Sequence, residues 1–118
     1  MNYRKFLIAA LLVMSFAVQA KDITVTRLTC EMRDGRVTTS DTPRLGWQMS
    51  SPENGTRQTA YEIEIRDVWA GKVVWNSGKV KSAQSQLVSC ADAVLEKDRH
   101  YTWRVRVWDE ADTPSAWS

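Results

Sequence analysis

The segment from His100 to Asp109 constrains the fold of this chain more than any other part of the sequence. One face of it carries Tyr101, Trp103, Val105 and Val107, and the other carries Thr102, Arg104, Arg106 and Trp108. Successive side chains of a β-strand point to opposite faces of its sheet. The alternation therefore predicts a strand whose apolar face packs in a hydrophobic core.

Similar patterns recur along the chain, whereas helical periodicity is hard to find after residue 20. Further strands are expected at Ile23 to Met32, Leu45 to Met49, Tyr61 to Arg66, Val73 to Asn76 and Gln86 to Cys90. Turn-forming pairs stand at Asp34-Gly35, Asn54-Gly55, Ala70-Gly71, Ser77-Gly78 and Thr113-Pro114. The sequence predicts an all-β fold of about six strands.

The first residues are typical of a signal peptide. Arg4 and Lys5 give a positive start, Phe6 to Val18 is mostly apolar, and Val18-Gln19-Ala20 supplies small residues for cleavage. A membrane anchor is the alternative, but it needs about 20 apolar residues, more than this run offers. We expect residues 1–20 to be removed and residues 21–118 to form one exported domain, periplasmic or extracellular, with no membrane span.

Charge and composition exclude several classes of function. The net charge of +2 comes from Arg4 and Lys5, and without them 14 basic and 14 acidic side chains remain. This balance gives no attraction to nucleic acid or anionic lipid. His100 is the only histidine, which excludes a multi-histidine metal site. The sequence offers no convincing context for a Ser-His-Asp arrangement, and we expect no cofactor.

Several motifs resemble those of a known family of domains. Leu95, six residues before Tyr101, resembles part of a tyrosine corner, and Trp47 resembles the core tryptophan of an immunoglobulin-like or fibronectin type III-like sandwich. The ordered segments Leu28 to Glu31, Pro43 to Gln48, Arg57 to Ile63, Trp75 to Val80, Tyr101 to Asp109 and Pro114 to Ser118 are similar to the amino-terminal domain of bacterial α-L-rhamnosidases of the inverting, helical-barrel type.

This resemblance implies a non-catalytic accessory domain of an exported glycoside hydrolase that releases terminal rhamnose in carbohydrate metabolism. Residues 21–118 would form a fibronectin type III-like sandwich. This domain would be a fragment of a larger protein. In that family the catalytic acids lie on a downstream barrel, so no catalytic residue is carried over to this chain and we expect it to be inactive alone. The implied partners are the downstream domains of the same enzyme.

A constant-type immunoglobulin sandwich has seven strands, so the last strand is expected to be missing or barely begun. Its loss would leave the backbone groups of residues 101–109 unpaired along one edge. We therefore expect the natural fold to continue beyond Ser118.

Two pairs of residues invite a chemical interpretation. Glu62 and Glu64 would lie about 7 Å apart on one strand, a separation that suits an inverting glycosidase, but beside Arg66 on a flat sheet we expect a solvated face. Cys30 and Cys90 are expected on one sheet with a strand between them, about 9.6 Å apart, too far for a disulfide. Both thiols are therefore expected to be free.

The six tryptophans divide into two groups. Trp47 and Trp103 are expected in the core. A single sandwich interior explains the others less well, and large exposed aromatic side chains mark binding surfaces. The candidate contact residues are Trp69, Trp75, Trp108 and Trp117. They would dock the domain onto its neighbours; the alternatives are a carbohydrate-binding module that holds rhamnose-containing glycans, or an adhesion domain.

Overall fold

A computed structural model describes residues 23–34, 42–52, 55–96 and 98–118. The expected signal peptide lies outside these residues, as do Gly35 and Asn54 of two expected turns. The described strands are β1 (Thr24–Cys30), β2 (Arg33–Asp34), β3 (Arg44–Ser50), β4 (Ala60–Asp67), β5 (Lys72–Asn76), β6 (Val88–Ser89) and β7 (Tyr101–Trp108).

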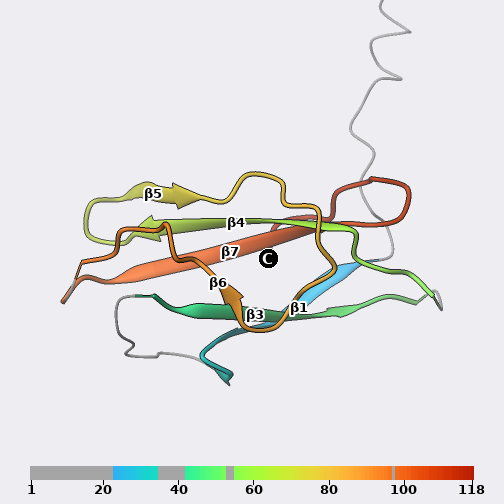
Figure 1. Ribbon diagram of the computed structural model, residues 1–118, viewed down its shortest axis with the longest axis horizontal. Helices are drawn as coiled ribbons and strands as arrows, with labels where there is room; N and C mark the ends of the chain where they lie inside the picture. Colours follow the sequence, from blue (N-terminus) through green and yellow to red (C-terminus); the bar gives the residue numbers. More distant parts are fainter. Residues whose placement is uncertain (1–22, 35–41, 53–54, 97) are drawn as a thin grey trace, which may run out of the picture.

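The strands form two antiparallel sheets packed as two layers (Figure 1). One sheet has the order β2-β1-β3-β6 and the other the order β5-β4-β7. The described residues include no helix, and so none that could cross a membrane. The prediction of an all-β fold is confirmed.

The pairing of β4 with β7 is the longest ladder of the fold. It brings Ile63 opposite Val105 and Ile65 opposite Trp103, while Glu64 faces Arg104. The alternation of both sequences is thus in register: apolar side chains of both strands face the other layer, and charged ones face outward.

Trp47 lies at the centre of the core with no exposed surface. Its ring centroid lies 5.3 Å from that of Tyr61, in an edge-on arrangement, and 6.4 Å from that of Trp103. Edge-on aromatic pairs at such distances are favourable. The expected core is confirmed by the residues that surround these rings, which include Ile63, Ile65, Val105 and Val107.

The tyrosine corner is present. The hydroxyl oxygen of Tyr101 accepts a hydrogen bond of 2.9 Å from the backbone N–H of Glu96, and Leu95 packs against the core. This contact fixes the loop before β7 to the first residue of the strand.

The ends of two expected strands were wrong. The first strand ends at Cys30, because Glu31 and Met32 have φ angles of 52° and 63° and turn the chain into β2. The strand expected at residues 86–90 is only Val88–Ser89, since Leu87 also has a positive φ of 52°. Left-handed backbone at non-glycine residues ends regular pairing.

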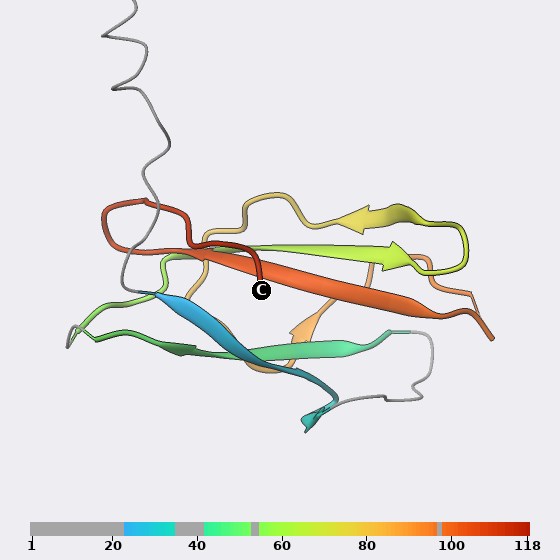
Figure 2. The same ribbon diagram turned by 180° about the vertical axis from the view of Figure 1, so that it is seen from behind.

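The free edge of β7 is better protected than the sequence predicted. After β7 the chain turns back through residues 109–113, forms an isolated bridge between Trp108 and Pro114 and then runs beside β7 (Figure 2). The N–H groups of Ser115 and Ser118 donate to the carbonyls of Val107 and Val105 at 2.7 and 2.9 Å. Their hydroxyl oxygens accept from the N–H groups of the same valines at 3.1 and 3.0 Å. This part of the edge is therefore not left unpaired.

Candidate functional site

Cationic and aromatic side chains alternate on the outer face of the β4–β7 pair. Trp117 lies against Arg104 and Arg106, with 4.3 and 4.8 Å between each guanidinium carbon and the ring centroid. Trp108 lies against Arg106 at 5.0 Å and against the amino group of Lys79 at 4.9 Å. We call these five residues the Trp–Arg ladder. Cation–π contacts of this kind are favourable, and they hold the chain's last described residues onto the sheet.

Glu62 and Glu64 lie beneath the ladder. Arg106 donates to Glu62 at 2.8 Å, and Arg104 donates to both carboxylate oxygens of Glu64 at 3.0 and 3.2 Å. Their side chains are only 15% and 12% exposed. The expectation that Glu62 and Glu64 form a solvated face was wrong, because β7 places Arg106 and Arg104 directly opposite them.

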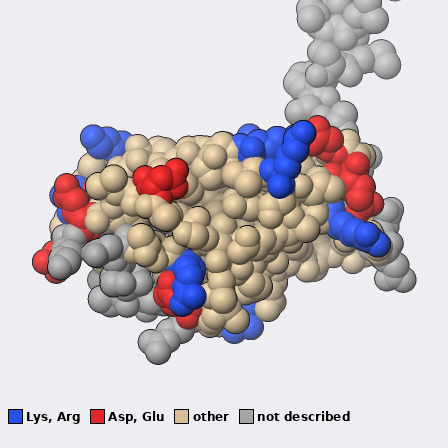
Figure 3. Space-filling model, in the orientation of Figure 1, with Lys and Arg blue, Asp and Glu red and all other residues tan. Residues whose placement is uncertain are grey.

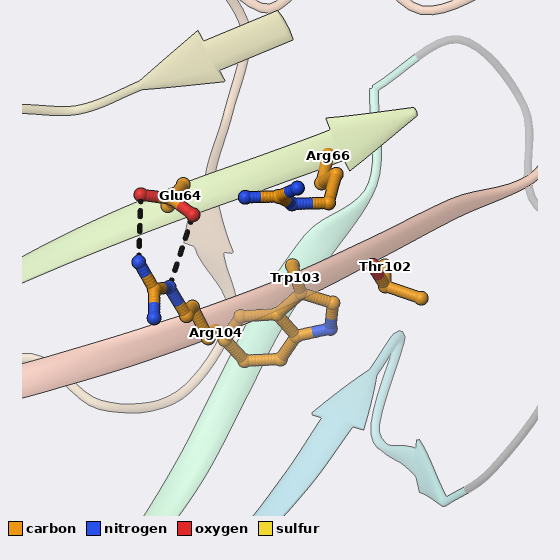
Figure 4. A pocket seen from close by; sticks show the side chains of 5 residues that line it. All are labelled: Glu64, Arg66, Thr102, Trp103 and Arg104. Atoms are coloured by element: carbon orange, nitrogen blue, oxygen red, sulfur yellow. Dashed lines mark hydrogen bonds and ion pairs between the residues drawn. The ribbon is translucent and has the colours of Figure 1, made fainter. Parts of the chain in front are cut away.

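A shallow depression of about 290 Å³ opens beside this face (Figure 4). Its lining residues are Glu64, Arg66, Thr102, Trp103 and Arg104. Figure 4 shows the Glu64 carboxylate engaged by the Arg104 guanidinium. With both its oxygens occupied in this way, that carboxylate serves to join β4 to β7.

The acidic residues after β7 stabilise a turn. One carboxylate oxygen of Asp109 accepts from the N–H groups of Ala111 and Thr113 at 2.9 and 3.0 Å. Asp112 forms an ion pair of 2.5 Å with Lys79. Asp109 thus caps backbone N–H groups of the turn, a role typical of short acidic side chains.

The four candidate contact tryptophans lie in three different settings. Trp108 is only 7% exposed and shares the Trp–Arg ladder with Trp117. Trp75 is partly buried and packs against the core. Trp69 is 63% exposed in the turn between β4 and β5. Trp69 is therefore the one of these four that offers most of its ring to another molecule.

The turn that carries Trp69 is fixed by Asp67. One carboxylate oxygen of Asp67 accepts from the N–H of Ala70 at 2.9 Å, and the other is ion-paired with Arg99. The Ala70 hydrogen bond, followed by the Arg99 guanidinium, holds the pKa of Asp67 below its usual range. His100, which directly precedes β7, stacks beside Trp69.

The two cysteines are free, as predicted: Cys30 ends β1 and Cys90 directly follows β6, and these strands lie in one sheet with β3 between them. Cys90 is completely buried and Cys30 partly so. Burial raises the pKa of Cys90 to about 11 and also raises that of Cys30. A thiol that resists ionisation is a poor nucleophile.

Gln58 is a buried polar residue that the sequence analysis missed. Its side-chain oxygen accepts from Trp47 Nε1 at 3.0 Å, and its Nε2 donates to the carbonyls of Ser82 and Gln84 at 3.0 and 2.9 Å. A buried polar group requires such partners. The partners of Gln58 come from distant parts of the chain, so no local sequence pattern predicts its burial.

In the parts of the chain that the structure covers, histidine, cysteine and acidic side chains nowhere gather in threes that could hold a metal ion. On the face seen in Figure 3, basic and acidic side chains are interspersed.

Comparison with known proteins identifies relatives of one kind. The α-L-rhamnosidase of Streptomyces avermitilis is 44% identical over 79 residues, which are 64% of this chain and 8% of the relative. That of Formosa agariphila is 33% identical over 86 residues, 67% of this chain and 9% of the relative. The chain thus spans about a tenth of the length of the relatives it matches.

Comparison with solved structures also identifies α-L-rhamnosidases. The crystal structure of the Streptomyces avermitilis α-L-rhamnosidase complexed with L-rhamnose matches 81% of this chain and 10% of its own, with a TM-score of 0.75 and 38% identity. The α-L-rhamnosidase structure from Dictyoglumus thermophilum matches 86% of this chain and 12% of its own, with a TM-score of 0.75 and 27% identity.

The resemblance drawn from the sequence motifs is therefore confirmed. The family described as "Rha78A-like, N-terminal immunoglobulin domain" matches residues 25–118, and this chain belongs to it.

Proposed function

We propose that this chain is the non-catalytic N-terminal accessory domain of an exported α-L-rhamnosidase and acts as a structural scaffold for the domains that follow. The observation that carries the proposal is the share of each relative that the chain spans, between 8% and 12%. The larger part of such an enzyme lies outside this domain and has the room for a catalytic barrel and its paired acids.

The geometry of the described residues supports a scaffold role. Inverting glycosidases need one carboxyl group as acid and a second as base. Glu62 and Glu64 are each ion-paired with an arginine instead, and both arginines also contact the ring of Trp117. The return of residues 113–118 along β7 further supports a role in holding the following chain in a defined direction.

A chimeric enzyme tests the scaffold role. The region of the Streptomyces avermitilis enzyme that matches this chain is replaced by residues 21–118, and hydrolysis of 4-nitrophenyl α-L-rhamnoside and the thermal midpoint are measured. We expect the chimera to keep both properties and an enzyme lacking the region to have a lower midpoint. An unchanged midpoint after deletion contradicts the scaffold role.

The chain by itself tests the absence of catalysis. Purified chain is expected to release no 4-nitrophenol from the same substrate. Turnover that persists through repeated purification, and disappears in the Glu64→Gln variant, contradicts the proposal.

Export is tested separately by N-terminal sequencing of the chain recovered from outside the cytoplasm. We expect it to begin at Lys21, after cleavage behind Ala20. A recovered chain that begins at Met1 contradicts the proposed signal peptide.

A further inference from the structure

Trp69 is highly exposed, and the turn that carries it is held by several hydrogen bonds. It is 63% exposed at the tip of the β4–β5 hairpin. The turn beneath it is closed by two hydrogen bonds of 2.9 Å, from Ala70 N–H to the Asp67 carboxylate and from Gly71 N–H to the Asp67 carbonyl. The φ of Gly71 is +66°, a conformation that a glycine adopts without strain.

The side of the hairpin tip is bound to the loop before β7. The N–H of Val68 donates to the carbonyl of His100 at 2.9 Å. The Nε of Arg99 donates to Asp67 at 3.0 Å, and Asp67 is only 5% exposed. These contacts join two segments around an exposed indole, so its orientation is set before any ligand arrives. Such preorganisation lowers the entropic cost of binding.

The surroundings of the indole have both an aromatic and a polar part. The ring of His100 is nearly parallel to that of Trp69, with 14° between the planes and 6.1 Å between the centroids. The guanidinium carbon of Arg99 lies 5.3 Å from the Trp69 ring centroid. We call Trp69, His100 and Arg99 the Trp69 platform.

We propose that the Trp69 platform is a saccharide-binding site for one pyranose ring of a neutral glycan. The C–H face of the sugar stacks on the indole, and its hydroxyl groups accept hydrogen bonds from Arg99. Among the described residues Arg99 bonds Asp67 through Nε and Nη2, which leaves its Nη1 donors for a ligand. This site goes beyond the proposed scaffold role and does not depend on it.

Charge and size decide the kind of ligand. The charge of Arg99 is balanced by Asp67, so the platform gives a sugar carboxylate little extra attraction. A stable protein interface buries about 800 Å² on each partner, whereas beside Trp69 this hairpin exposes three smaller valines, Val68, Val73 and Val74, around the small Ala70 and Gly71 and the charged Lys72. One flat ring beside one set of donors suits a single sugar better than a protein surface.

NMR on the ¹⁵N-labelled chain tests this proposal. The six tryptophan Nε1–H signals are recorded while methyl α-L-rhamnoside, maltose or sodium galacturonate is added, and the Trp69 signal is identified by its loss in Trp69→Ala. A one-ring contact on an open surface is weak, with a dissociation constant on the order of 1 mM. We expect at least one neutral sugar to shift the Trp69 signal saturably and the core Trp47 signal to remain in place.

Variants separate stacking from hydrogen bonding. Trp69→Phe is expected to weaken binding about threefold and Arg99→Gln about tenfold, while Trp69→Ala abolishes it. Val94→Ala, at a site that is 88% exposed, serves as the surface control and leaves binding unchanged. The proposal is overturned if no neutral sugar gives a saturable Trp69 shift up to roughly 100 mM, or if galacturonate alone binds. Either result leaves the chimera test of the scaffold role unaffected.

Discussion

Gln58 joins three parts of the molecule through a single side chain. It accepts from the indole of Trp47 in β3 and donates to the carbonyls of Ser82 and Gln84 in the segment between β5 and β6. The indole N–H would otherwise be buried without a partner, because Trp47 has no exposed surface. The amide therefore makes it possible to bury the largest side chain of the core together with its polar atom.

Replacing Gln58 by leucine is expected to lower the free energy of unfolding by about 2–4 kcal/mol, because the buried indole N–H of Trp47 and two part-buried carbonyls lose their partner. Urea denaturation followed by tryptophan fluorescence measures the change. The matched control is Gln48→Leu, on the exposed face of β3, which is expected to alter stability by less than about 0.5 kcal/mol. Equal losses for both variants would show that the hydrogen bonds of Gln58 are unimportant.

At the level of elements, the terminal segment after β7 takes the place of a neighbouring strand. A regular strand would pair backbone with backbone, but Ser115 and Ser118 use their hydroxyl oxygens to accept from the N–H groups of β7. Each serine also donates its own N–H to the same valine. Trp117, between these serines, rests on two arginines of β7. The segment thus provides hydrogen-bond partners for the backbone groups of Val105 and Val107 without the extended pairing of a full strand.

Ser115→Ala is expected to destabilise the fold by about 1–3 kcal/mol, because Ser115 is only 4% exposed and its loss leaves the N–H of Val107 unpaired. Native-state hydrogen exchange measured by NMR should show faster exchange at Val107, with less change at Ile63 in the neighbouring strand. Ser89→Ala, at an exposed position of β6, is the control. Unaltered exchange at Val107 in the Ser115 variant would contradict this account of the edge.

The elements that the sequence predicted well are those whose apolar residues alternate along the chain. β3, β4 and β7 begin or end within one residue of expectation, since one face of each packs in the core. β2 was not expected, because its two residues pair through a turn of left-handed Glu31 and Met32. The ion pairs of Glu62 and Glu64 were missed for another reason. They depend on the register between β4 and β7, which neither strand reveals alone.

The candidate site was less predictable than the fold. The sequence identified the surplus of aromatic side chains but could not distinguish the exposed Trp69 from Trp108, which the ladder covers. Trp108 ends β7, where Pro114 pairs with it and both Arg106 and Lys79 meet its ring, whereas Trp69 lies at the tip of a hairpin. Exposure is a property of the assembled sheets, so only the structure separates a binding surface from a packed one.

For the whole molecule, two buried ionisable groups limit stability at opposite ends of the pH scale. The pKa of Asp67 is lowered from 3.8, first by the N–H of Ala70 and then by Arg99. Its contribution to stability is present above pH 3.8 and is lost as the pH falls through its lower folded-state pKa. The pKa of Cys90 is raised from 9.0 to about 11, mainly because burial disfavours the thiolate. Its contribution is complete below pH 9.0 and is lost as the pH rises toward 11.

We therefore expect the urea midpoint of unfolding to be nearly constant at neutral pH and to fall at both extremes. Asp67→Asn should make the acid limb shallower and leave the alkaline limb as it is, because an amide does not titrate. Cys90→Ala should do the reverse, even though the smaller side chain lowers the midpoint at every pH by creating a cavity. The slope of each limb is thus the informative quantity. An alkaline limb of unchanged steepness in Cys90→Ala would assign the loss of stability to other groups, among them Tyr61, whose pKa burial also raises.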